Sequence, residues 1–146
     1  MAYWDTSCLL KLYAPESVST QLKMHVLRGA TVVTAEITRL ELFAALQRKE
    51  AANDLRPGSA RRAIVAHDAD VAAGLISVRG MEPATVDRFE AIIELCHRRS
   101  PPIFLRTLDA IHLATASVAG ELEIVATDKR LREAALALSF AVFPAS

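Results

Sequence analysis

The stretch MAYWDTSCLLKLYA (1–14) decides the fold class, because it reads as a short apolar strand, an acid and then a helix. The apolar run ends on Asp5, and from Thr6 to Ala14 the apolar residues recur at helical spacing. The same order returns in EIVATDKRLREAALA (123–137), where Asp128 stands between a strand and a helix. A strand that leads directly into a helix is the repeating unit of a parallel sheet.

Between these two stretches, short apolar strands continue to alternate with amphipathic helices. We expect further strands at 31–35, 76–81 and 140–143, and further helices at 16–27, 37–52, 60–75, 86–98 and 107–118. A parallel sheet connected in this way is covered by helices on both faces. The sequence therefore predicts an α/β fold of three layers with a central parallel sheet of four to five strands. The length of 146 residues fits one domain, 1–146.

Composition narrows the class of protein. Lys plus Arg and Asp plus Glu each number 17, so the chain lacks the strong basic excess of proteins that depend on non-specific phosphate contacts. Neither an apolar run long enough to span a membrane nor a signal peptide is evident, so a cytoplasmic location without membrane attachment is expected. Cys8 and Cys96 fit no metal-ligand spacing, and we interpret them as buried thiols in a reducing compartment.

Four acids are placed where an open parallel sheet gathers its ligands, at the carboxyl ends of the strands. Asp5 directly follows the first strand, and Asp128 directly follows the strand expected at 123–127. Asp109 lies in the first turn of a helix. Glu41 is the only charged residue in the apolar segment 40–46, so most of its neighbours must be buried.

Each acid also has a purely structural interpretation. Asp5 and Asp128 stand at favoured N-cap positions. Asp109 could interact favourably with the positive end of its helix dipole, and Glu41 could form a buried salt bridge with an arginine. These structural interpretations are less favoured when the four acids are considered together, because four acids at one edge of the sheet repel one another unless a cation lies between them. Carboxylate oxygens select Mg²⁺ or Mn²⁺, and such clusters cut phosphodiesters. We therefore expect the four carboxylates to converge tightly on a divalent cation.

The acids lie in four longer stretches, which are YWDTSCLLKLYAPE (3–16), AEITRLELFAALQRK (35–49), LRTLDAIHLATA (105–116) and VATDKRL (125–131). In this order the stretches resemble PIN-domain nucleases, and among them the VapC-type toxins of bacterial toxin–antitoxin pairs. Asp5, Glu41, Asp109 and Asp128 match the four acidic positions of the family. The resemblance covers nearly the whole chain, although residues 50–85 match only in being helical.

This resemblance implies an endoribonuclease that uses Mg²⁺ or Mn²⁺ to hydrolyse RNA and leaves 5′-phosphate products. It also implies a homodimer and a cognate antitoxin protein that inhibits the enzyme. Ser7 and Thr127 match hydroxyl positions that order water or a carboxylate near the metal. Arg106 matches an arginine of the family that precedes the third acid, and it could contact RNA, pair with a carboxylate or remain merely solvated.

Other residues have simpler interpretations. His112 lies one turn after Asp109, where a core histidine is favoured over a catalytic one, and Trp4 is interpreted as core. Glu36 ends the second strand and should be peripheral. Basic side chains that could meet an RNA backbone, or remain merely solvated, are Lys11, Arg39, Arg48, Lys49, Arg61, Arg62 and Arg130.

Two alternative functions are compatible with parts of this pattern. A catalytically inactive PIN domain that binds RNA or protein would be expected to have lost an acid, whereas all four are present here. A phosphotransferase with Asp5 as nucleophile would usually carry a second aspartate two residues on, where Ser7 stands.

Overall fold

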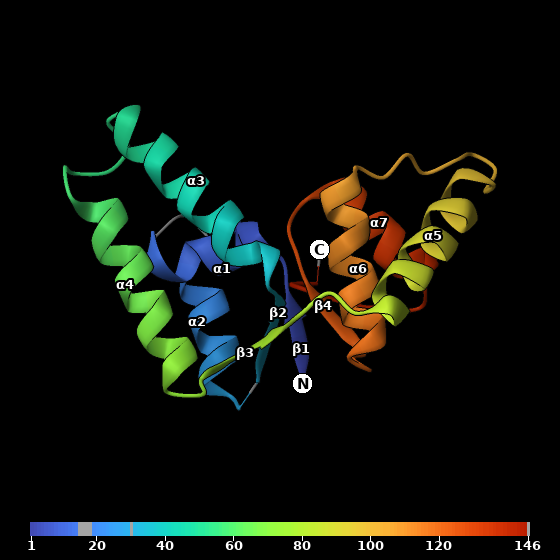
Figure 1. Ribbon diagram of the computed structural model, residues 1–146, viewed down its shortest axis with the longest axis horizontal. Coiled ribbons are helices and arrows are strands. Elements are labelled where there is room, and N and C mark those ends of the chain that lie inside the picture. Colours follow the sequence, from blue (N-terminus) through green and yellow to red (C-terminus); the bar gives the residue numbers. More distant parts are fainter. Residues whose placement is uncertain (15–18, 30, 146) are drawn as a thin grey trace.

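The computed structural model describes residues 1–14, 19–29 and 31–145. Its helices surround a sheet of five strands (Figure 1). The strands lie in the order β3-β2-β1-β4-β5, and all neighbouring strands are parallel. Their bounds are β1 Ala2–Trp4, β2 Val32–Ala35, β3 Ile76–Arg79, β4 Glu123–Val125 and β5 Ala141–Phe143. The parallel sheet predicted from the sequence is therefore confirmed.

The chain reverses its direction across the sheet at β1. From β1 it proceeds outward to β2 and β3, and then it returns past β1 to add β4 and β5 on the other side. The carboxyl ends of β1 and β4 are thus adjacent, while their connections leave in opposite directions. Open parallel sheets bind ligands in the crevice that forms at such a switch point. The register pairs Trp4 with Val125, so the segments that begin at Asp5 and Ala126 leave the sheet side by side.

Helices cover both faces of the sheet, as Figure 1 shows. One face carries α1 (Thr6–Tyr13), α2 (Ser19–Leu27), α3 (Ile37–Ala51) and α4 (Ser59–Ala72), and the other carries α5 (Pro83–His97), α6 (Thr107–Val118) and α7 (Lys129–Ala137). Connections between parallel strands are right-handed, so those that proceed outward from β1 use one face and those that return use the other. The three-layer arrangement is therefore as expected.

The central strand β1 supplies both halves of the core. Successive residues of a strand point to opposite faces, and Tyr3 and Trp4 are both fully buried. Tyr3 packs in the cluster that includes Leu113 on α6, whereas Trp4 packs with Leu9 and Leu22 on the other face. The expectation that Trp4 belongs to the core is confirmed.

Most element boundaries lie within a few residues of the sequence prediction. Helix α5 begins at Pro83 rather than at residue 86, because Glu82 and Thr85 form a capping box with proline at the first helical position. Helix α4 ends at Ala72 rather than at residue 75, since Gly74 adopts a φ of +78° and stops the helix. Residues 16–18 of the expected second helix lie outside the described residues.

Two expectations from composition can be compared with the structure. Cys8 and Cys96 are both buried and free, as expected. Among the described residues, no helix combines the length and apolar character that crossing a membrane requires.

Candidate active site

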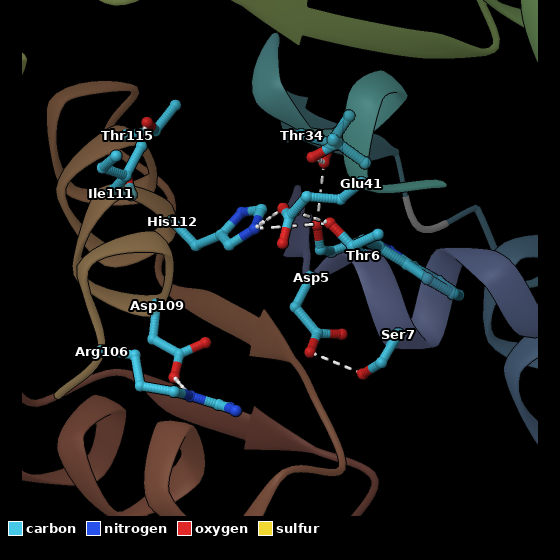
Figure 2. A network of polar contacts seen from close by, with 12 residues as sticks. Asp5, Thr6, Ser7, Thr34, Glu41, Arg106, Asp109, Ile111, His112 and Thr115 are labelled. Atoms are coloured by element: carbon cyan, nitrogen blue, oxygen red, sulfur yellow. Dashed lines mark hydrogen bonds and ion pairs between the residues drawn. The ribbon is translucent and has the colours of Figure 1, made fainter. Parts of the chain in front are cut away.

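A cleft with a volume of about 500 Å³ opens where β1 and β4 end. The four predicted acids, Asp5, Glu41, Asp109 and Asp128, all line it, and so does Arg48 among the basic side chains considered for RNA. The acids come from the end of β1, from α3, from α6 and from the residue that precedes α7. Figure 2 shows Asp5 and Glu41 on one side of the site and Asp109 on the other. Segments far apart in the sequence therefore bring all four acids to one cleft.

Asp5 is fixed between the sheet and α1. Its side chain is nearly buried, with the residue 5% exposed, and it serves as the N-cap of α1. The Cys8 N–H donates to Oδ1 at 2.9 Å, and the Ser7 hydroxyl donates to Oδ2 at 2.7 Å. Burial raises the pKa of Asp5 above its ordinary value, although these hydrogen bonds act in the opposite direction. The capping interpretation of Asp5 is correct, and it coexists with a place in the cleft.

Glu41 is held by a histidine rather than by the arginine that its burial suggests from the sequence. The Thr6 hydroxyl donates to Oε1 at 2.8 Å, and Nε2 of His112 lies 2.6 Å from the same oxygen (Figure 2). Partial burial acts to raise the pKa of Glu41, but His112, Thr6 and Arg106 together lower it below its ordinary value. Glu41 is therefore favoured as a carboxylate.

His112 connects this acid to the core. Its residue is 3% exposed, and its Nδ1 lies 2.5 Å from the Tyr3 hydroxyl. A hydroxyl that donates to Nδ1 leaves the proton of a neutral imidazole on Nε2, which then donates to Glu41. The prediction of a buried histidine with satisfied hydrogen bonds is confirmed, but sequence reasoning missed its contact with Glu41.

Arg106 joins the two remaining acids. Its Nε donates to Oδ2 of Asp109 at 2.9 Å, and its Nη2 lies 3.6 Å from Oδ2 of Asp128. Asp128 also caps α7 by accepting the Leu131 N–H at 2.9 Å through Oδ1. The Arg106 side chain is 64% exposed, so it can leave these acids without breaking a buried contact. Arg106 thus pairs with carboxylates, which is one of the three interpretations that the sequence left open.

The carboxylates share a cleft but do not converge as tightly as expected. Within residues 1–14, 19–29 and 31–145, no group of three His, Cys, Asp or Glu side chains is close enough to hold a metal ion. The guanidinium of Arg106 supplies the positive charge between Asp109 and Asp128 instead. The donor set still fits a hard divalent cation, since it consists of carboxylates. Oε2 of Glu41 and Oδ1 of Asp109 have no hydrogen-bond partner in the described parts of the chain.

Two further sequence candidates lie outside this cleft. The Thr127 hydroxyl accepts a hydrogen bond from Lys11 at 3.1 Å, so its partner is a cation rather than one of the four acids. Glu36 accepts the Met81 N–H at 3.0 Å and is peripheral, as expected. The thiol of Cys8 is not suited to ligate a metal, because burial raises its pKa to about 12.

With this geometry in place, comparison with known proteins identifies the family. The model of the PIN domain family matches residues 2–136, which is most of the chain. The chain belongs to the PIN-domain family. The resemblance predicted from the four acidic stretches is therefore confirmed at the level of the family.

Among PIN-domain proteins, this chain is similar to ribonuclease VapC35 of Mycobacterium tuberculosis. The two are 51% identical over 65 residues, which make up 40% of this chain and 48% of the relative. The match thus spans about half the length of that curated relative.

Several solved structures share the fold. VapC20 of Mycobacterium tuberculosis, described as a toxin that cleaves the sarcin–ricin loop, superposes with a TM-score of 0.67 at 22% identity, over 92% of this chain and 95% of that one. FitAcB of Neisseria gonorrhoeae gives a TM-score of 0.69 at 17% identity, over 98% and 96% of the two chains. A toxin–antitoxin complex from Klebsiella pneumoniae gives 0.59 at 18% identity, over 88% and 87%. These likenesses confirm the PIN-like fold.

Sequence reasoning found the acids of this PIN domain but missed the side chains that orient them. Thr6 and Tyr3 flank Asp5 closely in the sequence, yet both orient Glu41, directly or through His112. Spacing places His112 on the same helix face as Asp109, but it gives no signal for the contact with Glu41.

Proposed function

We propose that this PIN domain is a metal-dependent endoribonuclease, the toxin of a type II toxin–antitoxin pair. The observation that carries the proposal is the gathering of Asp5, Glu41, Asp109 and Asp128 around one cleft at the switch point of the sheet. The match to ribonuclease VapC35 supports RNA as the substrate. The substrate phosphodiester would enter the open side of the cleft, beside Arg106.

The four acids are the proposed ligands of Mg²⁺ or Mn²⁺. When bound, such an ion supplies Lewis-acid activation of water and neutralises charge on the phosphate. Two of these acids are oriented by donors that belong to the folded chain. Ser7 and the Cys8 N–H orient Asp5, and the Leu131 N–H orients Asp128. These contacts form within the folded chain and orient two of the acids, but the carboxylates must still move closer together to share one ion.

Glu41 and Arg106 have different proposed roles. Thr6 and His112 both hold Oε1 of Glu41, which leaves Oε2 for the cleft. Arg106 must release Asp109 and Asp128 when a divalent cation takes its place. The released guanidinium can then pair with a phosphate oxygen of the RNA, for which its planar fork is well suited.

The direct test is cleavage of RNA by the purified protein with Mg²⁺, with Mn²⁺ or with a chelator. We expect cleavage only with metal, and products that carry a 5′-phosphate. Asp5→Asn and Asp109→Asn should each reduce the rate at least 10- to 100-fold, since even outer partners of metal ligands have effects of that size. Asp54→Asn makes the same chemical change at an exposed turn and should retain the wild-type rate.

Two outcomes would contradict this proposal. Cleavage that persists in the chelator would exclude the metal-dependent mechanism. Tight RNA binding without cleavage at any metal concentration would instead favour the inactive PIN domain that only binds.

A cognate antitoxin and a second copy of the chain are the proposed protein partners. The solved structures with this fold include a toxin–antitoxin complex, which supports the first partner. Sedimentation velocity of the chain alone and with its antitoxin would test both. A strictly monomeric species at high concentration would contradict the homodimer.

A further inference from the structure

A second hollow lies directly beside the catalytic cleft. Its volume is about 470 Å³, and it shares two wall residues, Arg106 and Asp128, with the cleft. The segment that joins α5 to α6 forms one wall, and the first turn of α7 forms the other. A polymer held in the cleft would therefore continue into this hollow.

One wall presents an aromatic ring to solvent. Phe104 is 63% exposed, whereas its neighbours Ile103 and Leu105 are 6% and 8% exposed and belong to the core. The side chains on either side of Phe104 are anchored in the core, so the ring of Phe104 lies on the outside of this segment. The ring of His97 lies 5.4 Å from the Phe104 ring, measured between centroids, and supports it from the side. Phe104 thus presents an aromatic surface to solvent beside the cleft.

The opposite wall presents cations. Lys129 and Arg130 are both exposed on the first turn of α7. Within the described residues neither makes a hydrogen bond or ion pair. By contrast, Arg39 is paired with Asp68, and Lys11 donates a hydrogen bond to Thr127.

The charges of the hollow favour an anion. Asp128 is already paired with Arg106, which leaves Glu133 as the acid facing Lys129 and Arg130. Two unpaired cations against one acid give the outer part of the hollow a net positive charge. Phosphates are attracted to such a surface, while an exposed aromatic ring stacks on unpaired bases.

We propose that this hollow is a subsite for single-stranded RNA, in which Phe104 stacks on a base and Lys129 and Arg130 contact the backbone phosphate next to the one that is cleaved. This subsite rests on the proposed nuclease function and assigns to Phe104, Lys129 and Arg130 the binding of the nucleotide next to the cleaved bond. A base that is paired in a duplex cannot stack on Phe104 without leaving its helix, so the subsite selects unpaired RNA.

Binding can be measured without cleavage in an Asp5→Asn background with Mg²⁺, by fluorescence anisotropy of a short fluorescein-labelled single-stranded RNA. Phe104→Ala in that background should weaken binding about 5- to 100-fold, the loss of one stacked base. Phe104→Trp should restore it. Leu122→Ala removes a similarly exposed apolar side chain elsewhere and should have no effect.

The cations are tested by the salt dependence of the same binding. Lys129→Ala with Arg130→Ala should weaken binding and reduce the slope of log affinity against log salt by about 0.7 for each phosphate that is no longer neutralised. Lys23→Ala with Arg28→Ala removes two exposed cations, one on α2 and one just after it, and serves as the charge-matched control. Arg28 lies near Met1 and Ala2, at the amino ends of the strands.

The subsite would be disproved if Phe104→Ala bound RNA as tightly as its parent, or if it weakened duplex and single-stranded RNA equally. An effect of Phe104→Ala on antitoxin binding alone would also overturn it, because the hollow would then dock protein. In each case, metal-dependent cleavage by the wild-type protein would leave the nuclease proposal standing. Absence of both RNA binding and cleavage in the wild type would end the two proposals together.

Discussion

At the scale of single residues, the cleft depends on hydrogen-bond donors that orient its acids. Glu41 has two of them, Thr6 and His112, and His112 is itself oriented by Tyr3. Tyr3 is fully buried in β1, so water cannot replace His112 as the hydrogen-bond partner of its hydroxyl. The core and the candidate site are therefore joined by one chain of hydrogen bonds.

Tyr3→Phe should break this chain while preserving the packing of the ring. The change leaves Nδ1 of His112 buried without a donor, which costs about 1–3 kcal/mol of the free energy of unfolding. Urea denaturation followed by circular dichroism would measure the loss. Tyr13→Phe, the same change on a half-buried ring, should cost less because water can reach Asp70. Equal stability of Tyr3→Phe and wild type would show that the hydrogen bond to His112 contributes nothing.

At the scale of helices and strands, the sequence predicted nearly the whole fold. Strong signals lie close together in the chain, such as the apolar run that ends on Asp5 or the helical spacing of residues 107–118, whose bounds match α6. Helix ends were less predictable when they depended on a single local contact, such as the capping box at Glu82.

The candidate site was predictable in its acids but not in their partners. Asp5 and Asp128 follow apolar strands, and the ends of parallel strands meet at one edge of a sheet. By contrast, the pairing of Glu41 with His112 joins residues 71 positions apart. It depends on how α3 and α6 sit on opposite faces, which no local pattern encodes. The place of Arg106 between Asp109 and Asp128 likewise depends on the position of α7.

Alkaline pH should loosen the contact between α1 and α4. Tyr13 on α1 donates to Oδ2 of Asp70 on α4 at 2.5 Å. Burial, followed by the hydrogen bond and charge of Asp70, raises the pKa of Tyr13 above its ordinary value. A raised folded pKa means that the stabilisation is fully present below about pH 10, the ordinary tyrosine pKa, and is lost as the pH rises above it.

The melting temperature of the wild type should therefore fall above about pH 10. Tyr13→Phe should fall less steeply, because it has no proton to lose at this position. Thermal melts at several alkaline pH values would compare the two slopes. Burial also raises the pKa of Tyr3, the other tyrosine, so Tyr3→Phe should flatten the curve as well. Identical slopes for wild type and Tyr13→Phe would refute the assigned pKa direction.

At the scale of the whole molecule, the cleft is the seam between the two helical layers. Asp5 and Glu41 belong to the layer of α1 to α4, whereas Asp109 and Asp128 belong to the layer of α5 to α7 (Figure 1). Across this seam the acids repel one another, and the guanidinium of Arg106 offsets only part of that repulsion. A divalent cation bound by all four acids would cross-link the two helical layers and so stabilise the folded chain.

Mn²⁺ should therefore raise the melting temperature of the folded chain. A concentration of one hundred times Kd adds about 2.7 kcal/mol, or roughly 5–10 °C for a chain of this size. Asp109→Asn should lose most of this gain. Arg106→Gln should melt below the wild type in a chelator but gain more from Mn²⁺, since no cation competes for Asp109 and Asp128. If Arg106→Gln instead matches the wild type both with and without Mn²⁺, the guanidinium does not occupy the place of the metal.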